Sequence, residues 1–386
     1  MATAPLPRPT LWQRTKRLID RTLGTAGRAL SKPLVAEEIE IAPAPALARM
    51  PVPANVAMVP LVFMEGFADI FEEVQPNFRQ VVHRLRNVQV AWHGSVVKGL
   101  RVFLPSLPQP WMELELAGIF LLRQFKNRKV SELTTRPAGL AFDSWSGNYF
   151  HWIAEALPRL ALLRKVQPDC VVLLPGPNPP EYVTRTVSAL GFTYTCALAP
   201  GELVLVPDLW VAVRPGRHGY MVPELVREVR EAVMTSLLPH LDPTKKATRR
   251  LYVSRSRQNW RQLTNEGEIV AVLERYGFET IYFEDMTFVE QVRTMYEADI
   301  FIGIHGANMT NILFMTPGSH AIEMMSNTYI NPSYLSMADS IGVSYSLVPS
   351  TLGSPLEVEN NYADITADPA LVEQVVLPLC QSQTTD

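Results

Sequence analysis

In the second half of the chain, an apolar segment runs into a turn that contains glycine. Residues 300–304 are apolar apart from Gly303, and His305, Gly306 and Ala307 follow them. Glycine lets the backbone approach a ligand closely, and the start of a helix offers N–H donors and a partial positive charge. The pattern therefore predicts a pyrophosphate site, since such groups bind readily at helix starts. The residues expected to contact that group are His305, Gly306, Ala307, Asn308, Thr310 and Asn311.

Two arginines and a carboxylate are expected at the same edge of the sheet. Arg255 and Arg261 follow a predicted strand at residues 250–254, and Glu323 closes a predicted strand at residues 320–325. Guanidinium forks suit phosphate oxygens, and a carboxylate could bind the hydroxyl pair of a ribose. Because the sequence has no Asp-x-Asp pair, we expect the arginines and the helix start to neutralise a diphosphate without a metal ion.

Each of these features also has an interpretation without a ligand. A strand, a glycine and a helix follow one another in many α/β proteins that bind no phosphate. His305 could be a hydrogen-bonded structural residue, and Glu323 could cap a helix or pair with an arginine. The two arginines could be surface side chains. The sequence has neither a G-x-G-x-x-G loop nor a Walker-type loop, which weakens the usual dinucleotide and ATP interpretations.

A second group of polar residues lies well upstream. His151, Glu155 and Arg159 share one face of a predicted helix at spacings of four residues, and Asn148 or Ser146 could cap its start. A neutral imidazole can take the proton of a hydroxyl group as its oxygen attacks a carbon atom. His151 is therefore the first candidate for a general base.

The assignment of the base stays open among three residues. Glu155 or Asp143 could orient the ring of His151, or could take the proton in its place. The alternative without catalysis is an aromatic-rich core helix that contains a buried His–Glu pair.

Strands alternate with helices through the second half of the chain. Strands are predicted at residues 250–254, 278–283, 299–304, 320–325 and 343–348, with helices at residues 265–276, 287–298, 308–314 and 332–341 between them. Thr287 and Glu290 form a capping-box pattern. Apolar strands that alternate with helices indicate a parallel sheet covered on both faces, as in a Rossmann-like domain. The pattern from residue 54 to residue 215 is more mixed.

Size, charge and cysteine content exclude several classes of protein. The chain has 386 residues, which suits two domains, and its net charge of -3 predicts no strong field for nucleic acid. Its 3 cysteines give no disulfide framework or zinc pattern, which favours a reducing compartment. No apolar run approaches the roughly 20 residues of a membrane span, and no secretory signal is visible.

The first 32 residues are basic and have apolar residues near helical spacing. This pattern is typical of an amphipathic helix on an anionic membrane surface, and equally of a loose arm or a helix packed on the body. A stretch rich in Pro, Ala and Glu at residues 32–53 is predicted to be a linker.

Three blocks together resemble glycosyltransferase family 61. The first reads Gly-Asn-Tyr-Phe-His-Trp at residues 147–152 and Glu-Ala-Leu-Pro-Arg at residues 155–159. The second reads Arg-Leu-Tyr-Val-Ser-Arg at residues 250–255, with Arg261 and Asn265-Glu266 after it. The third covers residues 303–311 and continues with Phe314, Pro317-Gly318 and Ile322-Glu323. The chain has Asn308-Met309 where the family usually has Gly-Leu, and Ile304 where it often has Pro.

This resemblance implies a GT-B architecture, an α/β fold with two Rossmann-like domains that face a cleft. It implies inversion at the anomeric carbon, with a nucleotide-diphosphate sugar as donor, no cofactor and no bound metal. Carried onto this chain, the resemblance places the donor contacts at Arg255, Arg261, residues 305–311 and Glu323. It places the base and the acceptor contacts at His151, Glu155 and Asp143. Asn148 and Arg159 are expected on the acceptor side.

We expect four regions along the chain. They are a basic arm and linker at residues 1–53, an acceptor-side domain at residues 54–220, a nucleotide-sugar-binding domain at residues 221–350, and a tail at residues 351–386. In GT-B proteins the last helix often crosses back to the first domain, and residues 369–379 are the candidate for it.

The sequence therefore predicts an inverting, metal-independent glycosyltransferase that acts on a glycan or lipid-linked acceptor in bacterial surface polysaccharide synthesis. We expect it in the cytoplasm, peripheral on the inner face of the membrane through its basic arm, and without a nucleic-acid partner. The rival interpretations are a nucleotide-sugar epimerase of the same fold and a non-catalytic glycan-binding protein that retains the fold.

Overall fold

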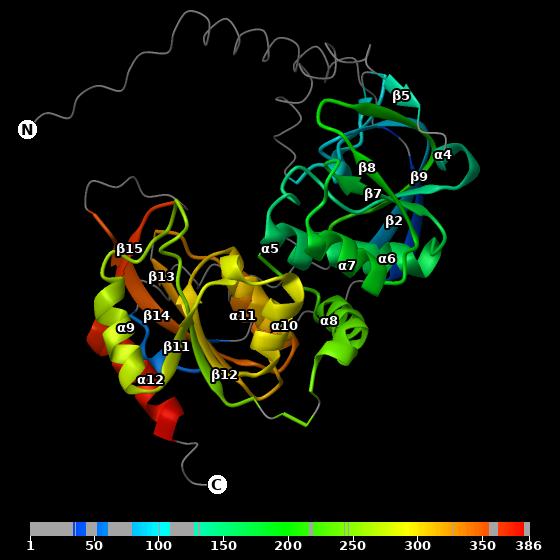
Figure 1. Cartoon of the computed structure of the whole chain (residues 1–386). Coiled ribbons are helices and arrows are strands. Elements are labelled where there is room, and N and C mark those ends of the chain that lie inside the picture. Colours follow the sequence, from blue (N-terminus) through cyan, green and yellow to red (C-terminus); the bar gives the residue numbers. More distant parts are fainter. Residues whose placement is uncertain are drawn as a thin grey trace, which may run out of the picture.

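The computed structural model is a mixed α/β protein with two sheets side by side and helices packed around them (Figure 1). The structure describes residues 34, 36–43, 52–60, 79–99, 101–108, 127–129, 132–215, 219–242, 244–245, 247–326, 328–354 and 362–381. The predicted basic arm lies outside these residues. Within them, no helix combines the length and the apolar character needed to cross a membrane.

The second half of the chain forms a sheet in the order β11-β10-β12-β13-β14-β15. Neighbours from β11 to β14 pair in parallel, and β15 pairs with β14 antiparallel. The strands are β10 (Arg249–Val253), β11 (Phe278–Ile281), β12 (Ala298–Ile304), β13 (His320–Ser326), β14 (Ser344–Leu352) and β15 (Ile365–Ala367). The predicted parallel sheet is confirmed, and the central strands β12 and β13 are buried along nearly their whole length, as helices on both faces require.

Helices cover both faces of this sheet. On one face α9 (Glu266–Arg275) and α12 (Pro369–Gln381) pack over Ile300, Ile302 and Ile304. On the other face α10 (Phe288–Tyr296), the 3-10 helix η7 (Ala307–Phe314) and α11 (Ser333–Ser340) share a core with Phe301. The predicted capping box of α10 is present, since the side chains of Thr287 and Glu290 bond each other's backbone N–H.

The strand order creates a switch point in this sheet. β10 and β12 are neighbours although β11 separates them along the chain. The helix after β10 lies on one face and the helix after β12 on the other. In open α/β sheets, ligands bind outside the carboxyl ends of strands at such a point. Arg255 is the second residue after the end of β10, and His305 is the first residue after the end of β12.

The first half of the chain forms a sheet of mixed direction, ordered β4-β3-β2-β9-β6-β7-β8. Its strands are β1 (Glu37–Ala42), β2 (Gln80–Ala91), β3 (Val96–Lys98), β4 (Arg101–Val102), β5 (Asn127–Lys129), β6 (Ala138–Leu140), β7 (Val171–Pro175), β8 (Tyr194–Leu198) and β9 (Leu203–Ala212). β6, β7, β8 and β9 run parallel, whereas β2 pairs antiparallel with β9. The α/β class is confirmed, but a uniform Rossmann-like first domain is not found. A short turn at Gly94, with φ +89°, leads β2 into β3, and strands joined so tightly must run antiparallel.

Several segments lie differently from the predicted regions. β1 belongs to the stretch predicted as linker, and it pairs with β2. The next described segment contains η1 (Val56–Met58) and lies against β14 of the second sheet, where the Asn55 side chain donates to the carbonyl of Leu347 at 2.7 Å and accepts from its N–H at 3.0 Å. A segment between β1 and β2 in the chain therefore packs on the second sheet, although both strands belong to the first sheet.

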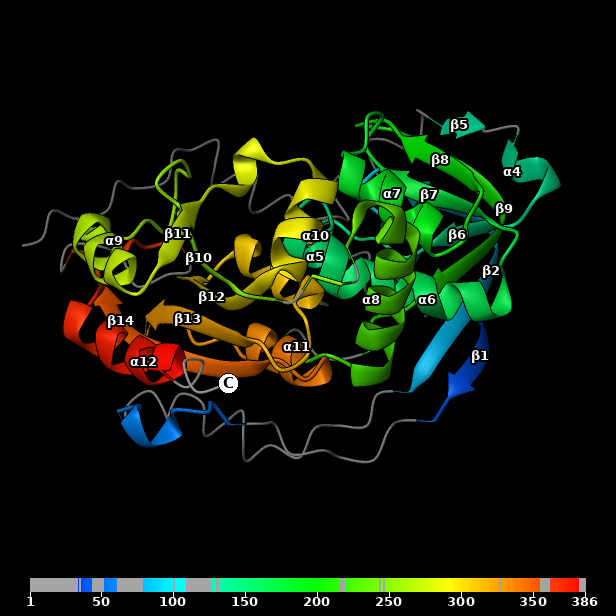
Figure 2. The same cartoon turned by 60° about the horizontal axis from the view of Figure 1, so that its bottom comes forward.

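The last helix does not cross back to the first domain. α12 packs on α9 and β14 of its own sheet (Figure 2). Its buried residues Val372, Val375 and Val376 join the apolar cluster of that face, which holds it there. The prediction of a crossing helix at residues 369–379 was therefore wrong.

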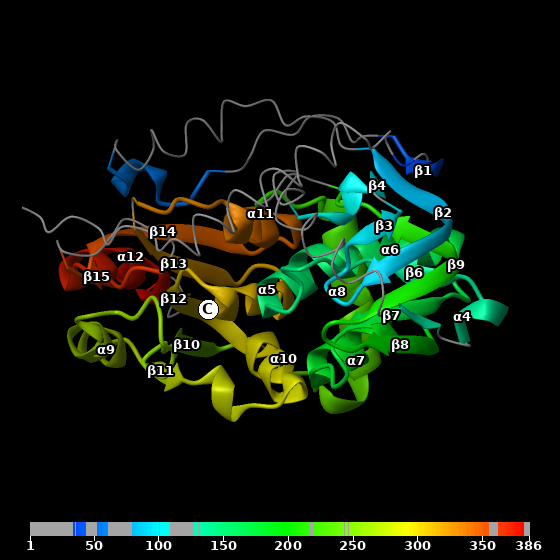
Figure 3. The same cartoon turned by 90° about the horizontal axis from the view of Figure 1, so that it is seen from above.

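Helices join the two halves. α8 (Pro223–Leu237), predicted at the start of the second domain, packs against α6 (Leu157–Val166) and α7 (Glu181–Ala189) of the first half and against α11 of the second. The short helix α5 (Tyr149–His151) lies between the halves, next to η7 (Figure 3). The Tyr149 hydroxyl donates to the side-chain oxygen of Asn311 at 2.6 Å, and the rings of Phe150 and Tyr334 stack edge to face.

Candidate active site

The helical segment that begins at Tyr149 carries His151 on its first turn. Its cap is Asn148, whose side-chain oxygen accepts from the backbone N–H of Phe150 at 2.9 Å, as one of the two predicted caps. Nδ1 of His151 lies 2.7 Å from a carboxylate oxygen of Glu155. Between α5 and α6 the chain makes a π-helical turn, η4 (Trp152–Ala156), and such turns are frequent at functional sites. The predicted His–Glu pair is therefore present at the start of the helix.

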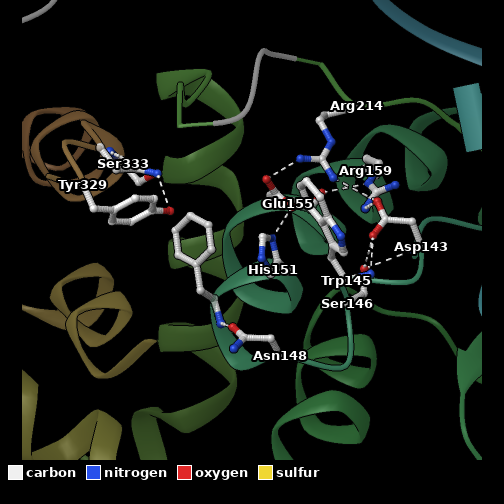
Figure 4. A network of polar contacts seen from close by, with 12 residues as sticks. Asp143, Trp145, Ser146, Asn148, His151, Glu155, Arg159, Arg214, Tyr329 and Ser333 are labelled. Atoms are coloured by element: carbon white, nitrogen blue, oxygen red, sulfur yellow. Dashed lines mark hydrogen bonds and ion pairs between the residues drawn. The ribbon is translucent and has the colours of Figure 1, made fainter. Parts of the chain in front are cut away.

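Behind this pair lies a buried network of charges (Figure 4). Arg214 donates to Glu155 and, at 2.9 Å, to Asp143. Arg159 donates to the same Asp143 oxygen at 2.9 Å, and its Nε donates to the backbone carbonyl of Glu155 at 3.0 Å. Trp145 donates its backbone N–H to Asp143 at 3.0 Å. The network fixes Glu155, and Glu155 in turn fixes the ring of His151.

The charge of Asp143 is balanced inside the protein. Burial alone would raise its pKa, but the guanidinium groups of Arg159 and Arg214 hold the pKa of this carboxyl below its usual range. Asp143 is only 2% exposed, so it reaches neither solvent nor a substrate. The structure thus favours the orienting role that the sequence left open for Asp143, and not the role of base.

Sequence reasoning missed Arg214. It follows the end of β9, and Asp143 follows the end of β6, which lies beside β9 and parallel to it. The carboxyl ends of neighbouring parallel strands meet at one edge, so Arg214 reaches Asp143 across 71 positions of the chain. Only the strand order would have revealed this partner.

The second half also holds a histidine against a carboxylate. Nδ1 of His305 contacts one oxygen of Glu323, and the Tyr345 hydroxyl donates to the other. Burial raises the pKa of Tyr345, so this phenol keeps its proton and acts as a donor. The hydroxyl of Tyr334 donates at 2.6 Å to the carbonyl of Gly306, the residue after His305. The start of the predicted donor loop is therefore held from two sides.

Glu323, the predicted partner of a ribose, is fully buried beside His305. β13 continues to Ser326, so Glu323 lies inside the sheet and not at its carboxyl edge. Its side chain is fully buried, and both oxygens have protein partners, His305 and Tyr345. Its position indicates that it orients His305.

Arg255 and Arg261 build the loop after β10. Arg255 donates to the backbone carbonyls of Arg261 and Trp260, both at 3.2 Å, and Arg261 donates to the carbonyl of His305 at 3.0 Å. Burial, followed by the nearby charge of Arg261, lowers the pKa of Arg255. The Nε of Arg261 is buried without a partner. In the part of the chain that the structure describes, neither guanidinium forms an ion pair with a carboxylate, so an anion would offset their charge.

The remaining residues of the predicted donor loop point in other directions. Asn311 accepts from Tyr149 and donates to Gln291 at 3.2 Å, so it joins the two halves. Thr310 is fully buried. The side-chain nitrogen of Asn308 is buried without a hydrogen-bond partner. His305, Gly306 and Ala307 are thus the part of the loop that faces the histidine of the first half.

One cavity of about 170 Å³ brings the two predicted blocks together. Asn148, Phe150 and His151 of the first half form one wall. The facing wall contains Arg261 and residues 305–307, and the remainder includes Tyr329, Asn331, Ser333 and Tyr334 from the segment after β13. Glu155, Asp143, Arg159, Arg255 and Glu323 stand behind these walls as supports. Tyr329 and Tyr334 were not predicted as site residues, because the position of the segment after β13 beside this loop depends on the strand order.

The comparison with protein families covers this region. A family model described as Glycosyltransferase 61 matches residues 149–322. These residues belong to glycosyltransferase family 61. The matched segment contains His151, Glu155, both arginines of the loop after β10 and the whole of η7. The resemblance seen in the sequence is confirmed.

Curated relatives share parts of this segment. The chain is 32% identical over 124 residues to an EGF domain-specific O-linked N-acetylglucosamine transferase of Drosophila melanogaster, which covers 31% of this chain and 24% of the relative. It is 24% identical over 202 residues to the beta-1,2-xylosyltransferase RCN11 of Oryza sativa subsp. japonica, covering 49% of this chain and 38% of the relative. The chain thus spans about a quarter of the first relative and less than two fifths of the second. Both relatives are named as transferases of a sugar.

The search for metal ligands covers the same described residues. Among them, no group of three or more His, Cys, Asp and Glu side chains is arranged to hold a metal ion. The metal-free mechanism implied by the family resemblance remains a prediction.

Proposed function

We propose that this protein is a glycosyltransferase that moves a sugar from a nucleotide-diphosphate donor to the hydroxyl of an acceptor. The observation that carries the proposal is the shared cavity, which has His151 on one wall and Arg261 with residues 305–307 on the other. A hydroxyl to be deprotonated and a diphosphate to be neutralised need these two kinds of group within reach of one reacting carbon. Membership of residues 149–322 in glycosyltransferase family 61 supports the same reaction.

On the acceptor side, His151 is the proposed general base. When Nδ1 donates to Glu155, Nε2 carries the lone pair and takes the proton of the acceptor hydroxyl. The hydroxyl oxygen forms a bond to the anomeric carbon of the donor sugar as the bond from that carbon to the phosphate oxygen breaks. Attack from the opposite face inverts the configuration at this carbon. Arg214 and Asp143 keep Glu155 in place for this step.

On the donor side, the leaving nucleoside diphosphate departs with the bonding electrons and gains negative charge. Arg261 and the backbone N–H groups at the start of η7 are the proposed partners of that charge. Arg255 adds a second buried guanidinium directly behind Gly306. We propose that this arrangement acts without a bound metal, in a GT-B-type pair of domains.

For the acceptor, we propose only a chemical class. We propose a glycan or lipid-linked acceptor, with surface polysaccharide as the product class and a cytoplasmic location that the basic arm ties to the membrane. The names of the relatives speak of an EGF-domain acceptor and of a beta-1,2-linked xylose, so they support sugar transfer and not a polysaccharide.

A transfer assay with product analysis tests this function. The protein is incubated with UDP-, GDP-, CMP- and dTDP-linked sugars, with and without a mixture of glycan acceptors, in the presence of EDTA. We expect one donor to give an acceptor-linked sugar of inverted configuration and, without acceptor, slow hydrolysis. An epimer formed from the donor alone would favour an epimerase, and a protein that binds glycans without turning over any donor would be a binding protein. Loss of transfer in EDTA, restored by Mn²⁺ or Mg²⁺, would contradict the metal-free mechanism.

A further inference from the structure

A second, larger cavity of about 340 Å³ lies at the junction of the two halves. The first half contributes Tyr149, Tyr182 and Glu181, from α5 and α7. The second half contributes the segment directly after β11, including Phe283 and Glu284. This cavity shares no lining residue with the one that holds His151. None of the steps proposed above assigns a role to it.

The walls of this cavity suit a flat, neutral group. Tyr149 and Tyr182 pack edge to face with ring centroids 5.0 Å apart, and Phe283 and Phe288 add further apolar surface. Burial raises the pKa of both tyrosines, so their hydroxyls stay protonated. None of the residues that line the cavity is Lys, Arg or His, so the cavity does not suit a phosphate group. Flat heterocycles stack on such aromatic side chains.

Amide groups supply hydrogen bonding on one side of the same cavity. Gln258, Gln291, Asn308 and Asn311 line it. The side-chain nitrogen of Asn308 is buried and has no partner, which costs free energy unless a ligand accepts its hydrogen bond. The ring nitrogens and carbonyls of a nucleobase are acceptors of this kind.

The two cavities adjoin each other along the chain. Ala307 lines the first cavity and Asn308 the second, so the start of η7 faces both. The loop after β10 does the same, with Arg261 in the first cavity and Gln258 in the second. A ligand that crosses the start of η7 would place one end beside Arg261 and the other against the aromatic side chains of the second cavity.

The position of Glu284 fits the ribose of such a ligand. It follows the end of β11, the second strand of this sheet along the chain and the neighbour of β10. In dinucleotide-binding sheets, an acidic residue about 20 positions after the phosphate-binding turn bonds the ribose hydroxyls. One oxygen of Glu284 accepts from Gln258, and the side chain lines the cavity. Glu284 therefore takes the role for which the sequence offered Glu323.

From this geometry we propose that the second cavity binds the nucleoside of the sugar donor, with the base between Tyr182 and Asn308 and the ribose hydroxyls on Glu284. The inference rests on the proposed glycosyltransferase function and divides its donor site into two parts. The diphosphate lies at Arg261 and the start of η7, and the sugar points toward His151.

Calorimetric titrations of three probes test this division. The probes are the nucleoside diphosphate that binds best among UDP, GDP, CDP and dTDP, its nucleoside alone, and inorganic pyrophosphate. In Tyr182→Ala we expect the affinity for the nucleoside and for the nucleoside diphosphate to fall roughly tenfold, since a stacked base is lost, and pyrophosphate to bind as before. In Arg261→Ala the pyrophosphate and the nucleoside diphosphate should bind more weakly and the nucleoside should not.

Two further variants complete the design. Glu284→Gln keeps the shape of the side chain and should reduce the preference for a ribonucleotide over its 2′-deoxy form. Tyr194→Ala is the matched control, because Tyr194 is an exposed tyrosine on β8 and lines neither cavity. It should leave all affinities unchanged.

Each contrary result has a distinct meaning. Unchanged nucleoside affinity in both Tyr182→Ala and Glu284→Gln would overturn the inference while nucleotide binding by the wild type still supports the proposed function. A rise in the acceptor KM alone would assign the cavity to the acceptor and would also overturn the inference. If the wild type binds none of the nucleotides at millimolar concentration, the proposed function fails and the inference fails with it.

Discussion

The two halves of the molecule each hold a histidine against a glutamate, but they do so in different ways. His151 and Glu155 are four residues apart on one helix, and Glu155 is also held by Arg214. His305 directly follows β12 and Glu323 lies in the neighbouring strand β13, 18 positions further along the chain. The second oxygen of Glu323 accepts from the hydroxyl of a tyrosine. One carboxylate is thus paired with a cation and the other with a neutral phenol.

This difference separates the proposed roles of the two rings. The first pair stands in a charge network that Asp143 and Arg159 complete, so Glu155 orients His151 while its own charge is balanced. In the second pair, Glu323 lies inside the sheet and His305 follows the end of β12. Arg261 donates to the carbonyl of His305, and Tyr334 donates to the carbonyl of the next residue. We therefore assign the proton transfer to His151 and the shape of the donor loop to His305.

Replacing each histidine in turn tests this assignment and should give the largest effect. In His151→Ala we expect turnover to fall by roughly 10²- to 10⁴-fold, the usual contribution of a general base, with little change in nucleotide affinity. In His305→Ala we expect mainly weaker nucleotide binding, by roughly tenfold, because the loop that faces the diphosphate loosens. Steady-state kinetics and calorimetry measure the two quantities separately.

The opposite pattern would break the comparison. If His305→Ala loses turnover and His151→Ala loses only nucleotide affinity, the roles are exchanged. Near-normal turnover in both His151→Ala and Glu155→Ala would remove the acceptor-side assignment altogether.

Local patterns predicted the elements that carry these residues. The capping box at Thr287, the apolar strand before His305 and the four-residue spacing from His151 to Glu155 all appear as expected. These features depend on neighbours within a few positions. These features could therefore be predicted from the sequence alone.

What the sequence could not predict depends on the order of the strands. Arg214 reaches Asp143 because β9 lies beside β6, and Tyr345 reaches Glu323 because β14 lies beside β13. Glu323 is enclosed by His305 and Tyr345, which approach it from the neighbouring strands β12 and β14. The spacing of residues along the chain does not predict pairs of side chains that neighbouring strands bring together.

The halves should also respond differently to acid. Burial lowers the pKa of His320, at the start of β13, to about 4. The usual pKa of a histidine is about 6.5, so between pH 4 and pH 6.5 the unfolded chain binds more protons at this residue than the folded protein does. The contribution of His320 to the free energy of unfolding is therefore fully present above about pH 6.5, and about 3 kcal/mol of it is lost as the pH drops to 4. Asp143 has a lowered pKa, so its contribution to stability lasts until the pH falls below about 4.

Urea unfolding from pH 7.5 to pH 4 measures this difference. The His320→Gln variant should lose less stability over this range than the wild type, because the group that gains a proton on unfolding is absent. Equal pH dependence in the two proteins would remove His320 from the account.

A single added methyl group tests the support of the donor loop. A Cβ on Gly306 would lie 2.5 Å from Nη1 of Arg255, so Gly306→Ala should displace this guanidinium from the loop carbonyls that it holds. We expect nucleotide affinity to fall by roughly tenfold in calorimetry. Gly267→Ala, where nothing lies within 4 Å of the added atom, is the control. An unaffected Gly306→Ala protein would show that Arg255 is not positioned by this contact.

The smallest effect is expected at the phenol that holds Glu323. Tyr345→Phe removes one hydrogen bond and leaves the carboxylate with His305 as its partner. The free energy of unfolding should fall by about 1 to 3 kcal/mol, because a buried acceptor loses its donor. Turnover at saturating donor should change less than in His151→Ala, and a loss of turnover as large as in that variant would place the Glu323 pair in the proton transfer.

The central claim is that residues from both halves face one substrate, and hydrogen–deuterium exchange tests it most directly. Exchange of the whole protein is compared with and without the nucleoside diphosphate that binds best, and then with an acceptor added. We expect slower exchange in peptides that contain residues 305–310 on binding of the nucleotide, and additional slowing around residues 148–152 on binding of the acceptor. Slowing in only one half with both ligands present, or in neither, would contradict a shared site.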